Sequence, residues 1–127
     1  MTMTFDEFSA ELSKLTMSKE IEDKFYELVK ATDEQMNERK IFIFGAKTKS
    51  MVHELAEMIR KRPASIPYTQ KRNQVIELYL EAIADKEPEI VYLDLLEKFC
   101  NAPTRFHRDS CVLTLIPIID DKLRKER

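Results

Sequence analysis

The sequence predicts an all-α protein: a single compact domain, residues 1–127, built from five or six helices. Three observations lead to this class. Glycine occurs once, at Gly45, whereas tight hairpins and phosphate-binding loops rely on glycine because it adopts positive φ without steric cost. Apolar residues recur every three or four positions along most of the chain, as amphipathic helices require. Prolines and short polar stretches separate these apolar stripes.

Two helices are expected at the N-terminal end. Thr4 and Glu7 have the spacing of a capping box, which predicts a first helix whose apolar stripe starts at Phe5. Ser18 can cap a second helix, because its hydroxyl can accept a hydrogen bond from the backbone of the first turn. The apolar stripe of this second helix extends to Thr32 or beyond.

The segment 36–59 has two interpretations. Its apolar residues suit one long helix interrupted by Gly45, and this interpretation is favoured. The run Ile-Phe-Ile-Phe at 41–44 also suits a short strand that leads into a helix capped by Thr48 or Ser50. Periodicity alone does not separate a short buried strand from a buried helical turn.

Further helices are expected between the prolines. Pro63 and Pro67 bound a connection, because proline disfavours helical structure at its own and the preceding position. A helix is predicted over 68–83, another from Pro88, and a last one from about Thr104 or Asp109 towards Lys125. Pro117 should kink or split that last helix, because proline lacks the backbone N–H. The predicted core includes Phe8, Phe25, Leu55, Tyr79, Leu95 and Leu115.

The motifs that suggest chemistry are incomplete. The stretch from His53 to Glu57 resembles half of a zinc-protease helix but lacks the second histidine, so a His53–Glu57 pair on an exposed face is expected. Cys100, His107 and Cys111 do not have a familiar ligand spacing. We therefore expect no metal, no cofactor, no disulfide and no catalytic residues. A core of this size can be stable without such cross-links.

Charge is distributed in blocks. Residues 1–38 carry a net charge of −6, residues 39–76 carry +7, residues 77–101 carry −5 and residues 102–127 carry +2. No acidic residue occurs from Met58 to Ile76. This basic segment is the predicted partner-binding site, with the contact residues Arg60, Lys61, Arg62, Tyr68, Lys71 and Arg72. The alternative is that the basic block pairs with acidic helices of its own fold.

These features favour a small non-enzymatic regulatory or accessory protein that binds an acidic protein surface; direct nucleic-acid binding by the 60–72 segment is the alternative. The sequence resembles, in composition only, the short glycine-poor helical proteins that phages direct at transcription, replication or defence machinery. That resemblance rests on no motif and transfers no site. No apolar run approaches the roughly 20 residues of a membrane span, and no signal peptide is apparent, so a cytoplasmic protein is expected.

Overall fold

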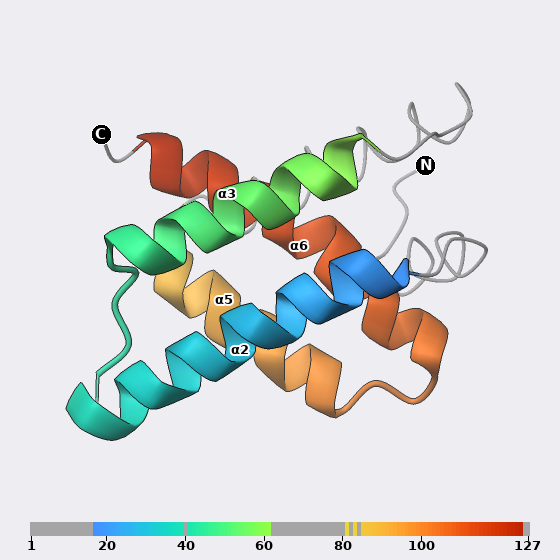
Figure 1. Cartoon of the computed structure of the whole chain (residues 1–127), viewed down its shortest axis with the longest axis horizontal. Helices are drawn as coiled ribbons and strands as arrows, with labels where there is room; N and C mark the ends of the chain where they lie inside the picture. The colour runs from blue at the N-terminus through green and yellow to red at the C-terminus, as the bar shows by residue number, and fades with distance from the viewer. Residues whose placement is uncertain (1–16, 40, 62–80, 82, 84, 126–127) are drawn as a thin grey trace.

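The computed structural model describes residues 17–39, 41–61, 81, 83 and 85–125. Within these residues the fold is all-helical and has no strand. Four helices are defined (Figure 1): α2 (Lys19–Arg39), α3 (Ala46–Arg60), α5 (Pro88–Cys100) and α6 (Arg105–Lys125). The predicted helix near 5–15 and most of the one over 68–83 lie outside the described residues, so the expected number of five or six is not confirmed. None of the described helices is long and apolar enough to cross a membrane.

Helix α6 is the element on which the others assemble. It packs against both α3 and α5, and α2 packs across α3 (Figure 1). The middle of α6 is apolar on every side, and residues 111–116 and 118–120 are all buried. A helix that is apolar all round is stable in water only when other elements cover it on several sides. The sequence of α6 therefore accounts for its central place.

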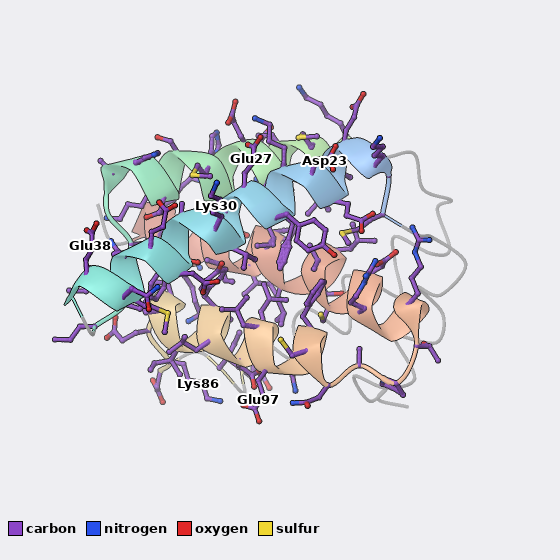
Figure 2. All side chains as sticks on the ribbon, turned by 60° about the horizontal axis from the view of Figure 1, so that its bottom comes forward. Asp23, Glu27, Lys30, Glu38, Lys86 and Glu97 are labelled. Atoms are coloured by element: carbon purple, nitrogen blue, oxygen red, sulfur yellow. The ribbon has the colours of Figure 1, made fainter. Side chains whose placement is uncertain are left out.

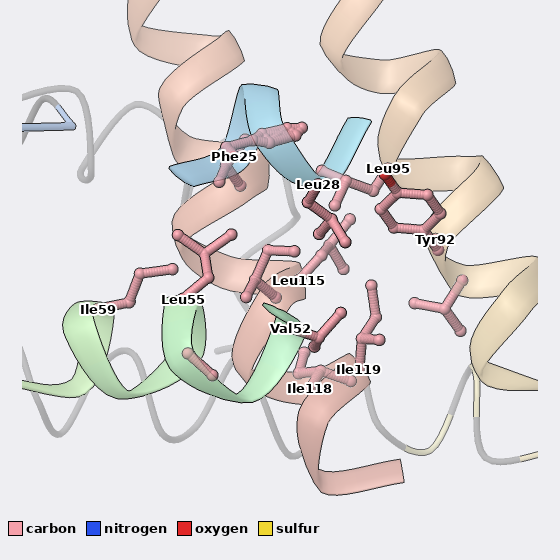
Figure 3. Packing of buried hydrophobic residues seen from close by; sticks show 14 of the residues in the cluster. Phe25, Leu28, Val52, Leu55, Ile59, Tyr92, Leu95, Leu115, Ile118 and Ile119 are labelled. Atoms are coloured by element: carbon pink, nitrogen blue, oxygen red, sulfur yellow. The ribbon is translucent and has the colours of Figure 1, made fainter. Parts of the chain in front are cut away.

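The core lies between α2, α3, α5 and α6 (Figure 3). Of the predicted core residues, Phe25, Leu55, Leu95 and Leu115 are confirmed as buried, each at 1% exposure or less. Phe8 and Tyr79 lie outside the described residues. A polar contact also crosses this core, because the hydroxyls of Thr32 in α2 and Tyr92 in α5 lie 3.0 Å apart and are both buried. Each hydroxyl thus has a partner where water is excluded.

The start of α2 confirms the predicted cap. Ser18 Oγ accepts a hydrogen bond from Ile21 N at 3.3 Å, and Ser18 O accepts one from Glu22 N at 3.0 Å. Glu20 and Glu22 lie in the first turn, where negative charge complements the helix dipole. The helix continues to Arg39, in agreement with the expected extent to Thr32 or beyond.

Residues 41–45 form neither the long helix nor the strand that the sequence suggested. They make an extended connection, and α3 begins at Ala46 with Gly45 as its N-cap rather than Thr48 or Ser50. Side chains of an extended chain alternate between two faces. Phe42 and Phe44 accordingly point inward and are buried, whereas the isoleucines at 41 and 43 are exposed.

The inward face of this connection is held by aromatic packing. The rings of Phe42 and Phe44 lie 4.8 Å apart, and each lies within 5.4 Å of the ring of Tyr92 in α5. Phe44 N also donates to Glu89 Oε1 at 3.3 Å. These contacts explain the corrected local structure, because a helix through 41–44 would separate Phe42 and Phe44 from their shared partner.

Each of the last two helices contains a proline. Pro88 occupies the first turn of α5, as predicted, where its missing N–H costs no hydrogen bond. Asn101 ends α5, and both its backbone N and its Nδ2 donate to Glu97 O at 3.0 Å. Helix α6 continues through Pro117 to Lys125, so the expected split does not occur, and a kink at Pro117 stays a prediction. Its last turn carries Lys122, Arg124 and Lys125, as the helix dipole favours.

Candidate functional site

Within the described part of the chain, a group of six linked ionisable side chains lies where α3 crosses the end of α6. We call this the charged cluster, which comprises His53, Glu57, Arg60, Asp120, Asp121 and Arg124. The three α3 residues are spaced by four and three positions, so they share one face of that helix. Asp120 and Arg124 are four positions apart on α6.

Asp120 is the centre of the charged cluster, and its side chain is 3% exposed. Its Oδ2 accepts hydrogen bonds from Arg60 Nη1 at 2.8 Å and from Arg124 Nη2 at 2.9 Å. His53 Nδ1 lies 3.2 Å from Oδ1, so the ring nitrogen that faces the carboxylate carries the proton. Burial opposes ionisation of Asp120, but the hydrogen bonds from Arg60 and His53, together with the positive charges of Arg124 and Arg60, outweigh it, and the pKa of Asp120 is lowered.

Arg60 connects the remaining acceptors. Its Nη1 also donates to Glu57 Oε1 at 2.9 Å, and its Nη2 donates to Asp121 Oδ1 at 3.0 Å and to Pro117 O at 3.3 Å. One guanidinium thus links two carboxylates and a carbonyl of α6 to α3. The planar arrangement of its N–H groups suits such multiple contacts better than an ammonium would.

A pocket of about 400 Å³ opens beside the charged cluster. Lys49, Ser50, His53 and Glu54 line it from α3, and Asp120, Leu123 and Arg124 line it from α6. Lys49 and Arg124 bring positive charge to this pocket, and Glu54 and Asp120 bring negative charge. Asp120 is already paired with two arginines. The lining therefore has no excess of one charge with which to select an ionic ligand.

Three of these groups have the chemistry of metal ligands. One ligand atom each of His53, Glu57 and Asp120 lies within 4.8 Å of the other two. A cation placed among them would compete with the guanidinium of Arg60, which already joins Glu57 to Asp120. The donors fit an ion-pair network that fastens α3 to α6 better than they fit a metal site.

The predicted partner-binding residues are only partly described. Arg60 has internal partners on both helices and a side chain that is 28% exposed, which matches the alternative of internal charge pairing. Lys61 follows α3 and is exposed. Arg62, Tyr68, Lys71 and Arg72 lie outside the described residues, so their role stays a prediction. The expected His53–Glu57 pair is replaced by the contact of His53 with Asp120.

The other motifs also have structural explanations. Cys111 is buried, and its Sγ donates to Arg108 O at 2.9 Å. Burial raises the pKa of Cys111 to about 12, so its thiol is not a ready nucleophile or metal ligand. Cys100 is exposed and free. The side chain of His107 lies outside the described residues.

A second buried aspartate lies near the start of α6. Asp109 Oδ2 accepts a hydrogen bond from Met17 N at 3.1 Å, and Arg108 donates to Oδ1 at 3.2 Å. Arg108 also reaches Glu22 in α2 at 3.4 Å. Asp109 thus fixes the chain that leads into α2, a role that sequence reasoning missed. One signal was available, because Asp109 and Asp120 both fall on the apolar stripe through Val112 and Ile116.

Several large apolar side chains are exposed on the described surface. Ile41 and Ile43 in the connection are 64% and 54% exposed, and Ile90 and Leu93 on α5 are 50% and 37% exposed. Tyr26 of α2 is partly exposed as well and lies edge-on to Phe99. None of these residues could be assigned to the surface from the sequence, because residue type alone does not distinguish an exposed isoleucine from a buried one.

Comparison with known proteins adds no relative from which a role could be transferred: no protein-family model, curated protein or solved structure matches this chain.

Proposed function

We propose that this protein is a non-enzymatic accessory or regulatory protein that acts by binding an acidic, partly apolar surface of another protein. The observation that carries the proposal is the outward face of the connection between α2 and α3. There Ile41 and Ile43 are 64% and 54% exposed, and Lys47, four residues after Ile43, is exposed as well. Protein-binding surfaces typically combine exposed apolar side chains with charges opposite in sign to those of the partner.

Contacts within the protein itself fix the conformation of the connection. Phe42 and Phe44 pack on Tyr92, and Phe44 N is bonded to Glu89, so the two isoleucines between and beside them have a defined direction. A surface that is already ordered loses less conformational entropy on binding. This supports recognition by Ile41 and Ile43 rather than a role as residual exposed surface.

Charge supports an acidic partner. The segment 39–76 has a net charge of +7, and Lys47 and Lys61 are exposed at the two ends of α3. Arg60 is committed to Asp120 and Asp121, so the exposed lysines are better candidates for intermolecular contact. The basic residues beyond Lys61 in the 60–72 segment keep their predicted role as contact residues and lie outside the described residues.

Capture of partners from a lysate of the native host tests the proposal. Ile43→Asp and Lys47→Glu should each abolish capture of a protein that the unaltered chain retains, and nuclease should not release it. Lys30→Glu is the matched control, because Lys30 is an exposed lysine of α2 outside the basic block and its replacement should leave capture unchanged (Figure 2).

Two outcomes would contradict the proposal. Equal loss of capture for Lys30→Glu would show non-specific charge attraction. Release of all bound material by nuclease, together with an affinity that falls steeply with salt, would instead indicate nucleic-acid binding. Circular dichroism of each variant would verify that the helices remain folded.

A further inference from the structure

The outer face of α5 carries a continuous exposed stripe. Ile90, Leu93, Glu97 and Cys100 follow one another at intervals of three, four and three residues and are all exposed. This spacing places them along one side of the helix. Lys86, just before α5, lies on the same outward side as Glu97 (Figure 2). We call Lys86, Ile90, Leu93 and Glu97 the α5 stripe.

The charges at the two ends of the α5 stripe have no ion-pair partner among the described residues, although neighbouring charges do. Asp94 pairs with Lys98 at 3.8 Å, and Glu89 accepts the hydrogen bond from Phe44 N. The side chains of Lys86 and Glu97 form no such contact within the part of the chain that the structure describes. Both are therefore available to an outside group.

The backbone at each end of the stripe is fixed. Lys86 N donates to Ile83 O, and Lys86 O accepts from Lys122 Nζ of α6, both at 3.0 Å. At the other end, Glu97 O accepts two hydrogen bonds from Asn101. The two charges are thus presented at a set separation along the helix.

The order of residues in the stripe makes it complementary to itself. Lys86 lies four residues before Ile90, and Glu97 lies four residues after Leu93. When two copies of α5 pack antiparallel about a two-fold axis, Ile90 faces Leu93 of the second copy and Lys86 faces Glu97 of the second copy. A two-fold interface repeats each contact, so two apolar pairs and two ion pairs form at once. A parallel arrangement would instead oppose like charges.

We propose that the α5 stripe is a self-association surface through which two copies of this chain form an antiparallel, two-fold symmetric dimer. Only two large apolar residues per copy take part, so the interface is at the small end of specific interfaces and the dimer dissociates readily. This proposal uses residues other than those of the partner-binding surface, and either can fail without the other.

Sedimentation equilibrium of the full chain tests the dimer. We expect a monomer–dimer equilibrium in the micromolar-to-millimolar range. Lys86→Glu and Glu97→Lys should each raise the dissociation constant roughly tenfold, because each turns two attractive contacts into two repulsive ones. The double variant Lys86→Glu with Glu97→Lys should restore the original value, because every ion pair is rebuilt with its charges exchanged.

Two charge reversals on α2 serve as matched controls. Lys30→Glu and Glu38→Lys make the same charge changes at exposed positions of α2 and should leave the dissociation constant unchanged (Figure 2). A chain that stays monomeric to about 1 mM would overturn the proposal and leave the stripe to a different partner. Single variants that change nothing, or a double variant that fails to restore association, would overturn the antiparallel pairing.

Discussion

Helices α6 and α5 lie side by side but differ in how much of their surface the fold buries. The middle of α6 is buried all round, and even its two aspartates at 109 and 120 are enclosed and paired. Helix α5 is buried at Pro88, Val91, Tyr92 and Leu95, and its opposite side presents exposed apolar and charged residues. Substitutions in α6 should therefore act on folding, whereas substitutions on the outer side of α5 should act on association.

The two cysteines give the largest expected contrast between these helices. Cys100 at the end of α5 is exposed, whereas Cys111 in α6 is buried and its pKa is raised to about 12. At pH 8 the Cys111 thiol is therefore almost entirely protonated, and the thiolate is the reactive form. A chromogenic disulfide reagent should modify one thiol per chain rapidly and the second only after denaturation. Rapid modification of both would mean that α6 is not enclosed.

Truncation of α6 should produce the largest loss of stability. Leu115 is fully buried between α3 and α5 (Figure 3), so Leu115→Ala should lower the free energy of unfolding by about 2–5 kcal/mol. Ile90→Ala on the exposed side of α5 should change it by about 0.5 kcal/mol or less. Urea denaturation of both variants measures the difference. Similar losses of unfolding free energy for the two variants would contradict the assignment of Leu115 to the core and of Ile90 to the surface.

Removal of Arg60 should have an intermediate effect. Arg60→Ala leaves the buried carboxylate of Asp120 with Arg124 and His53 as its remaining partners. Loss of one partner of a fully buried ion pair costs about 3–5 kcal/mol. Because Arg60 is partly exposed and two partners remain, we expect about 1–2 kcal/mol by urea denaturation. Lys61→Ala, the exposed neighbour, is the control and should be nearly neutral. Destabilisation by both variants to the same extent would argue against the charged cluster.

The ionised side chain of Asp120 should make a smaller contribution to the stability of the fold, and this contribution should be lost in acid. The pKa of Asp120 is lowered in the folded state, because the hydrogen bonds from Arg60 and His53 and the positive charges of Arg124 and Arg60 together outweigh the effect of burial. The ionised form then stabilises the fold at pH values above its unfolded pKa of about 4, and this stabilisation is lost as the pH falls through the lower folded pKa. Asp120→Asn should therefore show a shallower decrease in melting temperature below about pH 4 than the unaltered chain. Identical slopes would show that Asp120 is not held ionised.

The sequence predicted helices best where local signals were strong. Ser18 and Pro88 marked the starts of α2 and α5, and the apolar stripes identified Phe25, Leu55, Leu95 and Leu115 as core residues. Residues 41–45 were predicted wrongly because their conformation depends on Tyr92 and Glu89, almost 50 residues away. A contact between distant segments has no local sequence signature.

The candidate sites were harder to predict for the same reason. The sequence indicated a charged face around His53 and Glu57, but the partner of His53 is Asp120, 67 residues later. The spacing within α5 could have revealed its stripe, yet only the three-dimensional structure shows which side of α5 is left uncovered. The binding role of the basic residues in the 60–72 segment remains a prediction. Arg60, one of these residues, forms ion pairs within the fold instead.

Leu93→Asp tests most directly whether α6 holds the fold while the outer side of α5 serves association. Leu93 is 37% exposed in the middle of the α5 stripe. Thermal melting and sedimentation equilibrium of this variant should give a melting temperature within about 3 °C of the unaltered chain and a dimer weakened at least about tenfold. A melting temperature lowered by about 10 °C or more with unchanged association would contradict this division between the two helices, because Leu93 would then belong to the folded core.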